Sequence, residues 1–287
     1  MLRSTVATCL LAALYSSQAN ALQPRDYLPR PDGVSAMQLL YTSTSANSFY
    51  VDGERAGDNL NLEQDIWVFL PVHYSTFMSM PTIFEAIIPF GRVSIDGADI
   101  GNNALSTSGL ADPSFLAGIW PISNDESQTW WAVSGWLTAP LGDYDNNQML
   151  NLGRNQWAFK AQTGLAKGFG KLIIEVIPSV EIYSNNNNFT SAGLTLKRDP
   201  LYAVETHISY DLTPSVLVSL DHFYLNGGAS SVGSTVIEEE LETHALQLTT
   251  RLALASNQFL SFQYKEDLSV KNGSKTNTVG VQFTYAF

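Results

Sequence analysis

Large apolar residues and polar residues alternate along most of this chain with a period of two. At its end, the odd positions from 279 to 287 are all large and apolar or aromatic, and the even positions between them are small or polar. This period places the two sets on opposite faces of a β-strand. Similar segments, separated by turn residues, predict twelve strands. The strands are expected at about 33–45, 60–72, 80–94, 109–122, 128–141, 153–166, 171–184, 199–212, 216–226, 241–254, 258–269 and 276–287.

The lengths of the connections alternate as well. Those after even-numbered strands are short, as at 167–170, 213–215 and 255–257, and those after odd-numbered strands are mostly longer and polar. Outer-membrane β-barrels have short periplasmic turns and longer outer loops, so this pattern fits a barrel whose two chain termini both lie in the periplasm. The segment 73–79 is long for a turn and 270–275 is short for an outer loop. Barrels of ten or fourteen strands therefore remain alternatives.

The start of the chain predicts export. Arg3 precedes the apolar run from Val6 to Tyr15, and Ala19-Asn20-Ala21 has the small-residue pattern of a cleavage site. We therefore expect a signal peptide at residues 1–21. The only cysteine, Cys9, lies inside it, so the mature chain is expected to form no disulfide.

The remainder is expected to be one domain with a short tail. Residues 22–32 contain three prolines and predict an extended periplasmic tail, which leaves residues 33–287 for the barrel. The final aromatic residue, Phe287, resembles the end of the C-terminal strand of bacterial outer-membrane barrels. That resemblance implies recognition by the barrel assembly machinery.

Composition agrees with a membrane barrel. Charged residues make up 15% of the chain, whereas soluble domains contain about 25%. No run of 18 apolar residues follows the predicted signal peptide, which argues against membrane-spanning helices. The net charge of −12 argues against nucleic-acid binding, which needs a basic surface. We therefore predict an all-β fold, a transmembrane antiparallel β-barrel of about twelve strands of the bacterial outer-membrane type. A soluble β-sandwich, whose strands also alternate, is the alternative.

Three motifs lie close together in the middle of the chain. They are Ser-Gly-Leu-Ala-Asp-Pro at 108–113, Ala-Pro-Leu-Gly-Asp-Tyr-Asp at 139–145 and Asn-Leu-Gly-Arg-Asn-Gln-Trp at 151–157. Their order resembles the outer-membrane family described as the putative MetA pathway of phenol degradation, with mild departures at Ala111 and at Ala139 and Leu141. The resemblance implies a transport-like role for hydrophobic or aromatic compounds.

The polar residues of these motifs are expected at the outer rim. Short side chains of this kind hydrogen-bond nearby backbone and fold a loop back on itself. An ordered rim is the favoured interpretation, a solute gate the second, and a cation site at Asp143 and Asp145 the third, since Ca²⁺ prefers six or more oxygen ligands. The rim candidates are Asp112, Asp143, Asp145 and Asn155.

Strand parity places a second set of candidates inside the barrel. Most are charged, and acidic residues predominate, so a water-filled pore would favour cations. The polar lumen candidates are Lys160, Glu175, Glu181, Glu205, His207, Asp211, Asp221, Arg251 and Lys265. Trp67, Trp136 and Phe223 are candidates for stacking an aromatic solute. The other interpretation of the aromatic residues is an interfacial girdle, expected to include Trp130, Trp131, Trp136 and Trp157.

Three functions follow from this interpretation. The first is passive passage of small hydrophobic or aromatic molecules, which in a small and largely filled barrel needs an apolar lining or a lateral opening. The second is a structural or adhesive barrel that acts through its outer loops. The third is a hydrolase built on a His207–Asp221 dyad, although the chain contains no Gly-x-Ser-x-Gly, P-loop, dinucleotide or zinc motif. No cofactor and no metal is predicted. The expected partners are outer-membrane lipid and lipopolysaccharide. The acidic run 238–242 is expected either to be a solvated loop or to bind divalent ions that bridge lipopolysaccharide phosphates.

Overall fold

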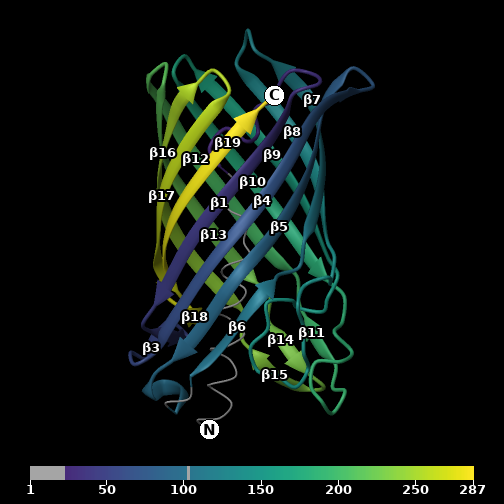
Figure 1. Ribbon diagram of the computed structural model, residues 1–287, viewed down its shortest axis with the longest axis vertical. Helices are drawn as coiled ribbons and strands as arrows, with labels where there is room; N and C mark the ends of the chain where they lie inside the picture. The colour runs from purple at the N-terminus through teal and green to yellow at the C-terminus, as the bar shows by residue number, and fades with distance from the viewer. Residues whose placement is uncertain (1–22, 102–103) are drawn as a thin grey trace.

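A closed antiparallel barrel of 12 strands forms the body of the molecule in the computed structural model, which describes residues 23–101 and 104–287 (Figure 1). The barrel strands are β1 (Ser35–Ala46), β4 (Asn61–Phe77), β5 (Met80–Asp96), β7 (Ser114–Asn124), β8 (Thr129–Thr138), β9 (Ala158–Phe169), β10 (Leu172–Tyr183), β12 (Leu201–Thr213), β13 (Val216–Gly227), β16 (Leu241–Ala255), β17 (Gln258–Val270) and β19 (Asn277–Ala286). The first and last strands close the barrel by pairing from Ala36↔Ala286 to Ser45↔Asn277. The predicted fold class is confirmed, and the predicted signal peptide lies outside the described residues.

Two strand predictions differ from the structure. β4 continues to Phe77, so the connection expected at 73–79 shrinks to Met78 and Ser79, both at positive φ. The strand expected at 109–122 is interrupted. β6 (Leu105–Leu110) pairs with one end of β5, and β7 starts only at Ser114. Pro113 lies in the gap, where it has no N–H to donate to a ladder.

The two ends of the barrel have different connections. Both termini of the barrel meet at what we call the short-turn end, where Ser35 and Phe287 exchange backbone hydrogen bonds of 2.9 and 2.8 Å. The opposite, long-loop end carries two small three-stranded sheets that the sequence did not predict (Figure 1). One consists of β2 (Phe49–Val51), β3 (Glu54–Gly57) and β18 (Gly273–Ser274), and the other of β11 (Leu196–Arg198), β14 (Ser230–Val232) and β15 (Thr235–Glu238); the 3-10 helix η1 (Ala98–Ile100) lies in another loop.

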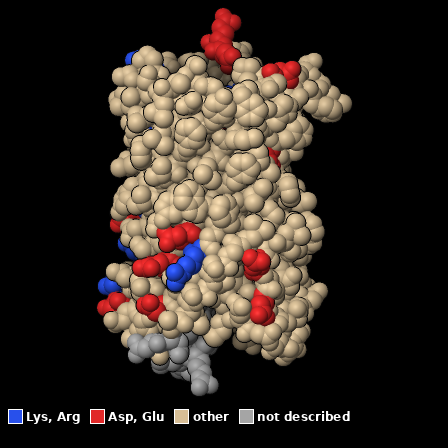
Figure 2. Space-filling view, in the orientation of Figure 1, with Lys and Arg blue, Asp and Glu red and all other residues tan. Residues whose placement is uncertain are grey.

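The outer surface of the barrel is apolar around its middle. Leu248 and Leu165, which point outward from β16 and β9, are 60% and 52% exposed. Figure 2 shows that charged side chains on the visible face gather toward the ends and leave a middle band almost free of charge. Such a band matches the hydrocarbon layer of a membrane. In the part of the chain that the structure describes, no helix is long and apolar enough to cross a membrane.

The barrel interior is filled at two levels. Toward the long-loop end, Leu150 and Leu152 from the loop after β8 pack on inward-facing strand residues such as Leu62 and Val93. A second cluster contains Tyr27 from the N-terminal segment. Its other large members are Trp120, Trp130, Trp136, Ile87, Leu116, Ile173 and Ile177. A barrel of this size is expected to hold side chains rather than a wide water channel.

The girdle interpretation was wrong for two of the tryptophans. Trp130 and Trp136 point inward from β8 and are 6% and 3% exposed, whereas their neighbour Trp131 is 39% exposed on the outer face. Strand parity explains the difference, because residues 130 and 136 share one face of β8. Position near a strand end is therefore a weaker predictor of a girdle residue than its parity.

A first prediction concerns the outer surface. Leu248 lies in the middle of β16, so Leu248→Arg places a charge near the membrane midplane and should destabilise the barrel by about 2–4 kcal/mol. The matched control is Leu254→Arg, on the same face of the same strand but at the short-turn end, where the cost falls to about 0–1 kcal/mol. Denaturant unfolding in lipid vesicles measures both values. Equal costs at the two positions would contradict the membrane placement.

Candidate functional site

A cavity of about 220 Å³ lies inside the barrel and is bordered by residues of both interior clusters. One part of its wall is apolar and comes from β4, β5 and β8. That part consists of Ile66, Val68, Leu70, Ile87 and Trp136. The cavity also touches charged side chains, among them Asp26, Glu85, Lys160, Glu181, Glu205 and Lys265. It is therefore amphipathic, with room for an apolar molecule beside groups that can hydrogen-bond.

The structure separates the predicted lumen residues into three groups. Lys160, Glu181, Glu205, Lys265, Trp136 and Phe223 line the cavity. Glu175, His207 and Asp221 are 0% exposed and lie within buried polar contacts instead. Asp211 and Arg251 lie nearer the short-turn end, at one level of the wall, because both are paired with Leu217 across neighbouring strands.

The placement of Trp67 inside the barrel was wrong. Trp67 is 41% exposed on the outer face of β4, where its ring centre lies 4.8 Å from that of Tyr41. Sequence reasoning also missed two carboxylates of the cavity, Asp26 and Glu85. Asp26 belongs to the predicted tail, and Glu85 lies in a strand that is apolar on both faces, so neither stood out by alternation.

Two lysines of the cavity lie over aromatic rings. Lys160 Nζ is 4.0 Å from the centre of the Trp136 ring, and Lys265 Nζ is 4.7 Å from that of Phe223. An ammonium group in this position is attracted by the negative face of the ring. The face that the ammonium covers is not open to a stacking solute. Each aromatic ring should therefore offer a solute its uncovered apolar edge, and the neighbouring lysine should offer a hydrogen-bond donor.

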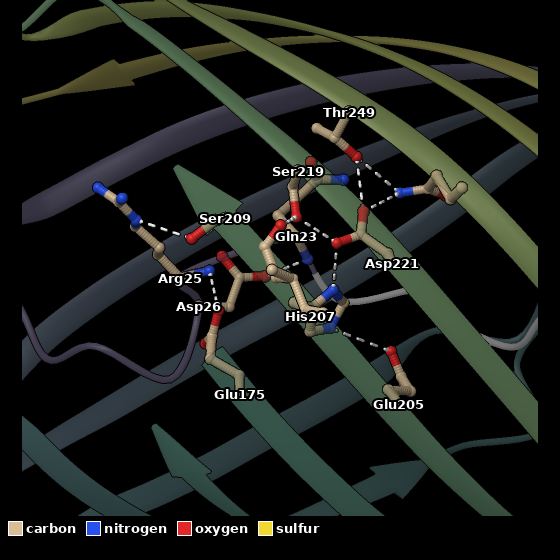
Figure 3. A network of polar contacts seen from close by, with 12 residues as sticks. Gln23, Arg25, Asp26, Glu175, Glu205, His207, Ser209, Ser219, Asp221 and Thr249 are labelled. Atoms are coloured by element: carbon tan, nitrogen blue, oxygen red, sulfur yellow. Dashed lines mark hydrogen bonds and ion pairs between the residues drawn. The ribbon is translucent and has the colours of Figure 1, made fainter. Parts of the chain in front are cut away.

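The described start of the chain folds into the barrel. It was expected as an extended periplasmic tail, but residues 23–30, here called the luminal segment, contact inward-facing residues of the strands. Glu175 accepts hydrogen bonds from the backbone N–H groups of Arg25 at 2.6 Å and of Tyr27 at 3.3 Å. The Arg25 guanidinium forms an ion pair with Asp211 at 2.9 Å. It also donates a hydrogen bond to Ser209 (Figure 3). A buried carboxylate and an ion pair thus hold the segment.

Tyr27 anchors the luminal segment. Its side chain is 5% exposed, its carbonyl oxygen accepts a hydrogen bond of 2.9 Å from Trp120 Nε1, and its hydroxyl lies 3.3 Å from Ser134 Oγ. The ring lies directly against Gly164 of β9, where a Cβ atom would approach the ring to 2.3 Å. Gly164 therefore leaves the space that the ring fills. Gln23 and Asp26 from the same segment border the cavity, so the segment forms one of its walls.

His207 and Asp221 form the dyad that the strand register predicted. His207 Nδ1 lies 2.9 Å from Asp221 Oδ1, with both side chains fully buried. Ser219 and Thr249 also donate to Asp221 (Figure 3). A nucleophilic serine would have to contact the histidine rather than the carboxylate. The other ring nitrogen, Nε2, is 3.9 Å from Glu205. The arrangement is that of a structural polar network.

The three central motifs meet at one junction at the long-loop end. Asp112 accepts hydrogen bonds from the backbone N–H groups of Gly142 at 2.9 Å and Arg154 at 2.7 Å, so it ties the second and third motifs to the first. Asp143 accepts from the N–H of Leu110 at 2.8 Å. Gly109 makes this contact possible, since it has φ +143 and a Cβ there would overlap the Asp143 carboxylate. The junction holds the loop of Leu150 and Leu152 inside the barrel.

The remaining rim candidates also order loops. Asp145 accepts hydrogen bonds from the backbone and side-chain N–H groups of Asn147, which hold the pKa of Asp145 below its usual range. Asn155 donates to the side-chain oxygen of Asn186 at 2.9 Å. Among the residues that the structure describes, no group of three or more histidine, cysteine or acidic side chains has the geometry of a metal site. These contacts fit an ordered rim better than a cation site.

One acidic residue of the run 238–242 is buried. Glu238 is 3% exposed at the end of β15. Burial raises the pKa of Glu238 to about 7, against the opposing influence of the nearby Arg198 charge. The small sheet β11–β14–β15 therefore contains a carboxyl group that ionises near neutral pH.

Comparison with known proteins places the chain among outer-membrane barrels. The model of a family described as "Putative MetA-pathway of phenol degradation" matches residues 43–283. An outer membrane channel from Pseudomonas putida F1 superposes with a TM-score of 0.88 at 24% identity, covering 93% of this chain and 100% of that one. No curated protein matches.

More distant barrels share the fold at lower similarity. The transport unit of the autotransporter AIDA-I from Escherichia coli gives a TM-score of 0.58 at 8% identity, covering 100% of this chain and 99% of that one. The β domain of the Bordetella autotransporter BrkA gives 0.52 at 8% identity, covering 90% and 100%. At these identities the likenesses concern the fold alone.

The luminal segment gives the second prediction. Tyr27→Ala removes the ring that fills the space beside Gly164, so the segment should loosen and the ion conductance of the barrel in planar lipid bilayers should rise several-fold. Tyr41→Ala is the matched control, because Tyr41 lies on the outer face beside Trp67 and should leave the conductance unchanged. A Tyr27→Ala barrel that conducts like the wild type would contradict the assigned role of the segment.

The third prediction concerns pH. The pKa of Glu238 is higher in the folded protein than in an unfolded chain, so its contribution to stability is present at low pH and is lost as the pH rises through about 7. Amide hydrogen exchange in β11, β14 and β15, corrected for intrinsic rates, should therefore be faster at about pH 8 than at about pH 5. Glu238→Gln should remove this difference. A variant that keeps the full pH dependence would assign it to another group.

Proposed function

The chain belongs to the family described as the putative MetA-pathway of phenol degradation, and on this premise we propose that it is an outer-membrane channel for small aromatic compounds. The family match extends over most of the chain and confirms the resemblance of its three motifs. The observation that carries the proposal is the amphipathic cavity inside the barrel. A barrel that carries no solute would be stable with a fully packed interior, because protein interiors are normally close-packed.

The size and lining of the cavity suit a single aromatic ring. A dry apolar cavity of about 150 Å³ is known to hold benzene, and this one measures about 220 Å³. The apolar wall from Ile66 to Leu70 and Ile87 supplies contacts for the ring. Lys160 can donate to a substituent oxygen, and Glu85 can accept from a hydroxyl group. A monocyclic aromatic compound with a hydroxyl substituent can contact the apolar wall through its ring and the polar side chains through its hydroxyl group.

The apolar band and the two types of connection support an orientation. With short turns in the periplasm, the motif junction and the two small sheets face outward. Lipid then surrounds the band, lipopolysaccharide surrounds the long-loop end, and the strand that ends at Phe287 is the element for the barrel assembly machinery to recognise. These partners are part of the proposal.

A solute in the cavity has two possible exits. One is past the luminal segment, which forms a wall of the cavity on the side of the short turns. The other is through the barrel wall, where the β4–β5 ladder lacks pairs between Phe69↔Ile88 and Val72↔Glu85, beside Pro71. Uptake that rises together with conductance in Tyr27→Ala would assign the first exit. Uptake that stays constant while conductance rises would assign the second.

The other two hypotheses receive less support. A structural or adhesive barrel does not need the cavity, and a hydrolase would need a nucleophile on His207, whereas Ser219 binds Asp221. An adhesive barrel predicts neither conductance nor uptake. A hydrolase predicts an activity that His207→Ala abolishes.

The fourth prediction tests the channel by filling its cavity. Ile66→Trp should abolish most of the uptake of radiolabelled phenol by Gram-negative cells that lack their own porins, because the larger side chain occupies the solute's space. Leu220→Trp is the matched control, since Leu220 is 46% exposed on the outer face. Heat-modifiable migration in gels verifies that both variants fold. Wild-type cells that take up no more phenol than cells without the protein would refute the channel.

A further inference from the structure

Two of the four histidines form a pair on the outer face of the barrel. His222 Nε2 on β13 lies 3.1 Å from His244 Nδ1 on β16, and the ring centres are 5.3 Å apart. Tyr224 supports the pair, with its ring centre 4.7 Å from that of His244. The β13–β16 ladder fixes the backbones, since Tyr224 is paired with His244 and His222 with Leu246. The pair is therefore held by the sheet rather than by a loop.

The pair lies where the apolar outer surface ends. Leu220 and Leu248 on the same two strands are 46% and 60% exposed and face lipid. Toward the long-loop end they are followed by the two histidines, and then by Asn226 paired with Glu242. Two imidazoles in direct contact thus occupy the level at which hydrocarbon gives way to polar headgroups. An interfacial aromatic girdle has no need of two adjacent histidines.

The geometry of the pair is close to that of two metal ligands. Imidazole nitrogens bind Zn²⁺ at about 2.0–2.1 Å, so two of them at a tetrahedral angle lie roughly 3.3 Å apart. The observed 3.1 Å needs an adjustment of only a few tenths of an ångström. A hydrogen bond between two imidazoles also leaves one nitrogen as an acceptor, whose lone pair is already directed at its partner.

We propose that His222 and His244 bind one divalent transition-metal ion, such as Zn²⁺, at the membrane-facing surface. The two side chains supply two ligands, and the open positions go to water or to an oxygen of a lipid headgroup. Imidazole selects Zn²⁺, Cu²⁺ or Ni²⁺ over the Mg²⁺ and Ca²⁺ that bridge lipid phosphates, because the latter prefer oxygen ligands. The site is separate from the cavity and does not depend on the proposed transport function.

The test is Zn²⁺ binding by the full-length mature barrel, purified in detergent without a histidine tag. Isothermal titration should give about one ion per barrel, and Zn²⁺ should raise the unfolding temperature because it binds the folded state. His222→Ala and His244→Ala should each weaken binding by about tenfold or more, since each removes one of two ligands. Mg²⁺ should give neither effect.

The matched control is His73→Ala. His73 is exposed at the short-turn end and bonds Ser35 at 2.8 Å, so its loss should leave Zn²⁺ binding unchanged. Unchanged binding after either His222→Ala or His244→Ala would overturn the proposal, as would a wild-type barrel that binds no Zn²⁺. Folding of each variant is verified by heat-modifiable migration, so a misfolded variant is not mistaken for a lost site. Adding lipopolysaccharide then tests whether a lipid oxygen completes the site, as an increase in affinity that depends on both histidines.

Discussion

The pairing of β1 with β19 is the interaction on which the rest of the structure depends. In lipid, an unpaired backbone N–H or C=O costs several kcal/mol, so a sheet must have no edge. Ten residue pairs, from Ala36↔Ala286 to Ser45↔Asn277, remove that edge. Once the barrel is closed, the parity of each strand decides which side chains meet lipid and which meet the interior. The strand residues that line the cavity and the histidine pair on the outer face follow from that division.

The interior that closure creates is narrow, and side chains fill it at two levels. At the long-loop end the filling comes from a loop held by Asp112, and beside the short turns it comes from a segment held by Glu175 and Asp211. A cavity of about 220 Å³ lies between the two fillings. Selection by such a barrel depends on what the cavity wall accepts. The loop held by Asp112 at the long-loop end therefore helps to maintain the shape of the cavity.

The two-residue alternation of apolar and polar residues predicted the barrel strands. Predictions were wrong or missing where that alternation is absent. All twelve barrel strands were expected because one face of each meets lipid. Trp67 was misplaced because its neighbours Ile66 and Val68 are also apolar, so a strand with an apolar interior shows no alternation. The luminal segment left no signal, since Arg25 meets Asp211 across 186 residues of chain. The His207–Asp221 contact was predictable because a short hairpin fixes its register.

The charges inside the barrel explain why the luminal segment is held by specific partners rather than by apolar contacts alone. Removing one member of a buried pair leaves an uncompensated charge, which costs about 3–5 kcal/mol. The Arg25–Asp211 pair lies toward the short-turn end, and its side chains are 12% and 36% accessible. Water can therefore solvate the two charges when they separate, so breaking this pair costs much less than breaking a buried one. Glu175, in contrast, is fully buried beneath the segment. The side chain of Arg25 can therefore detach at a smaller cost than the backbone of Arg25 and Tyr27, whose N–H groups are bonded to the buried Glu175.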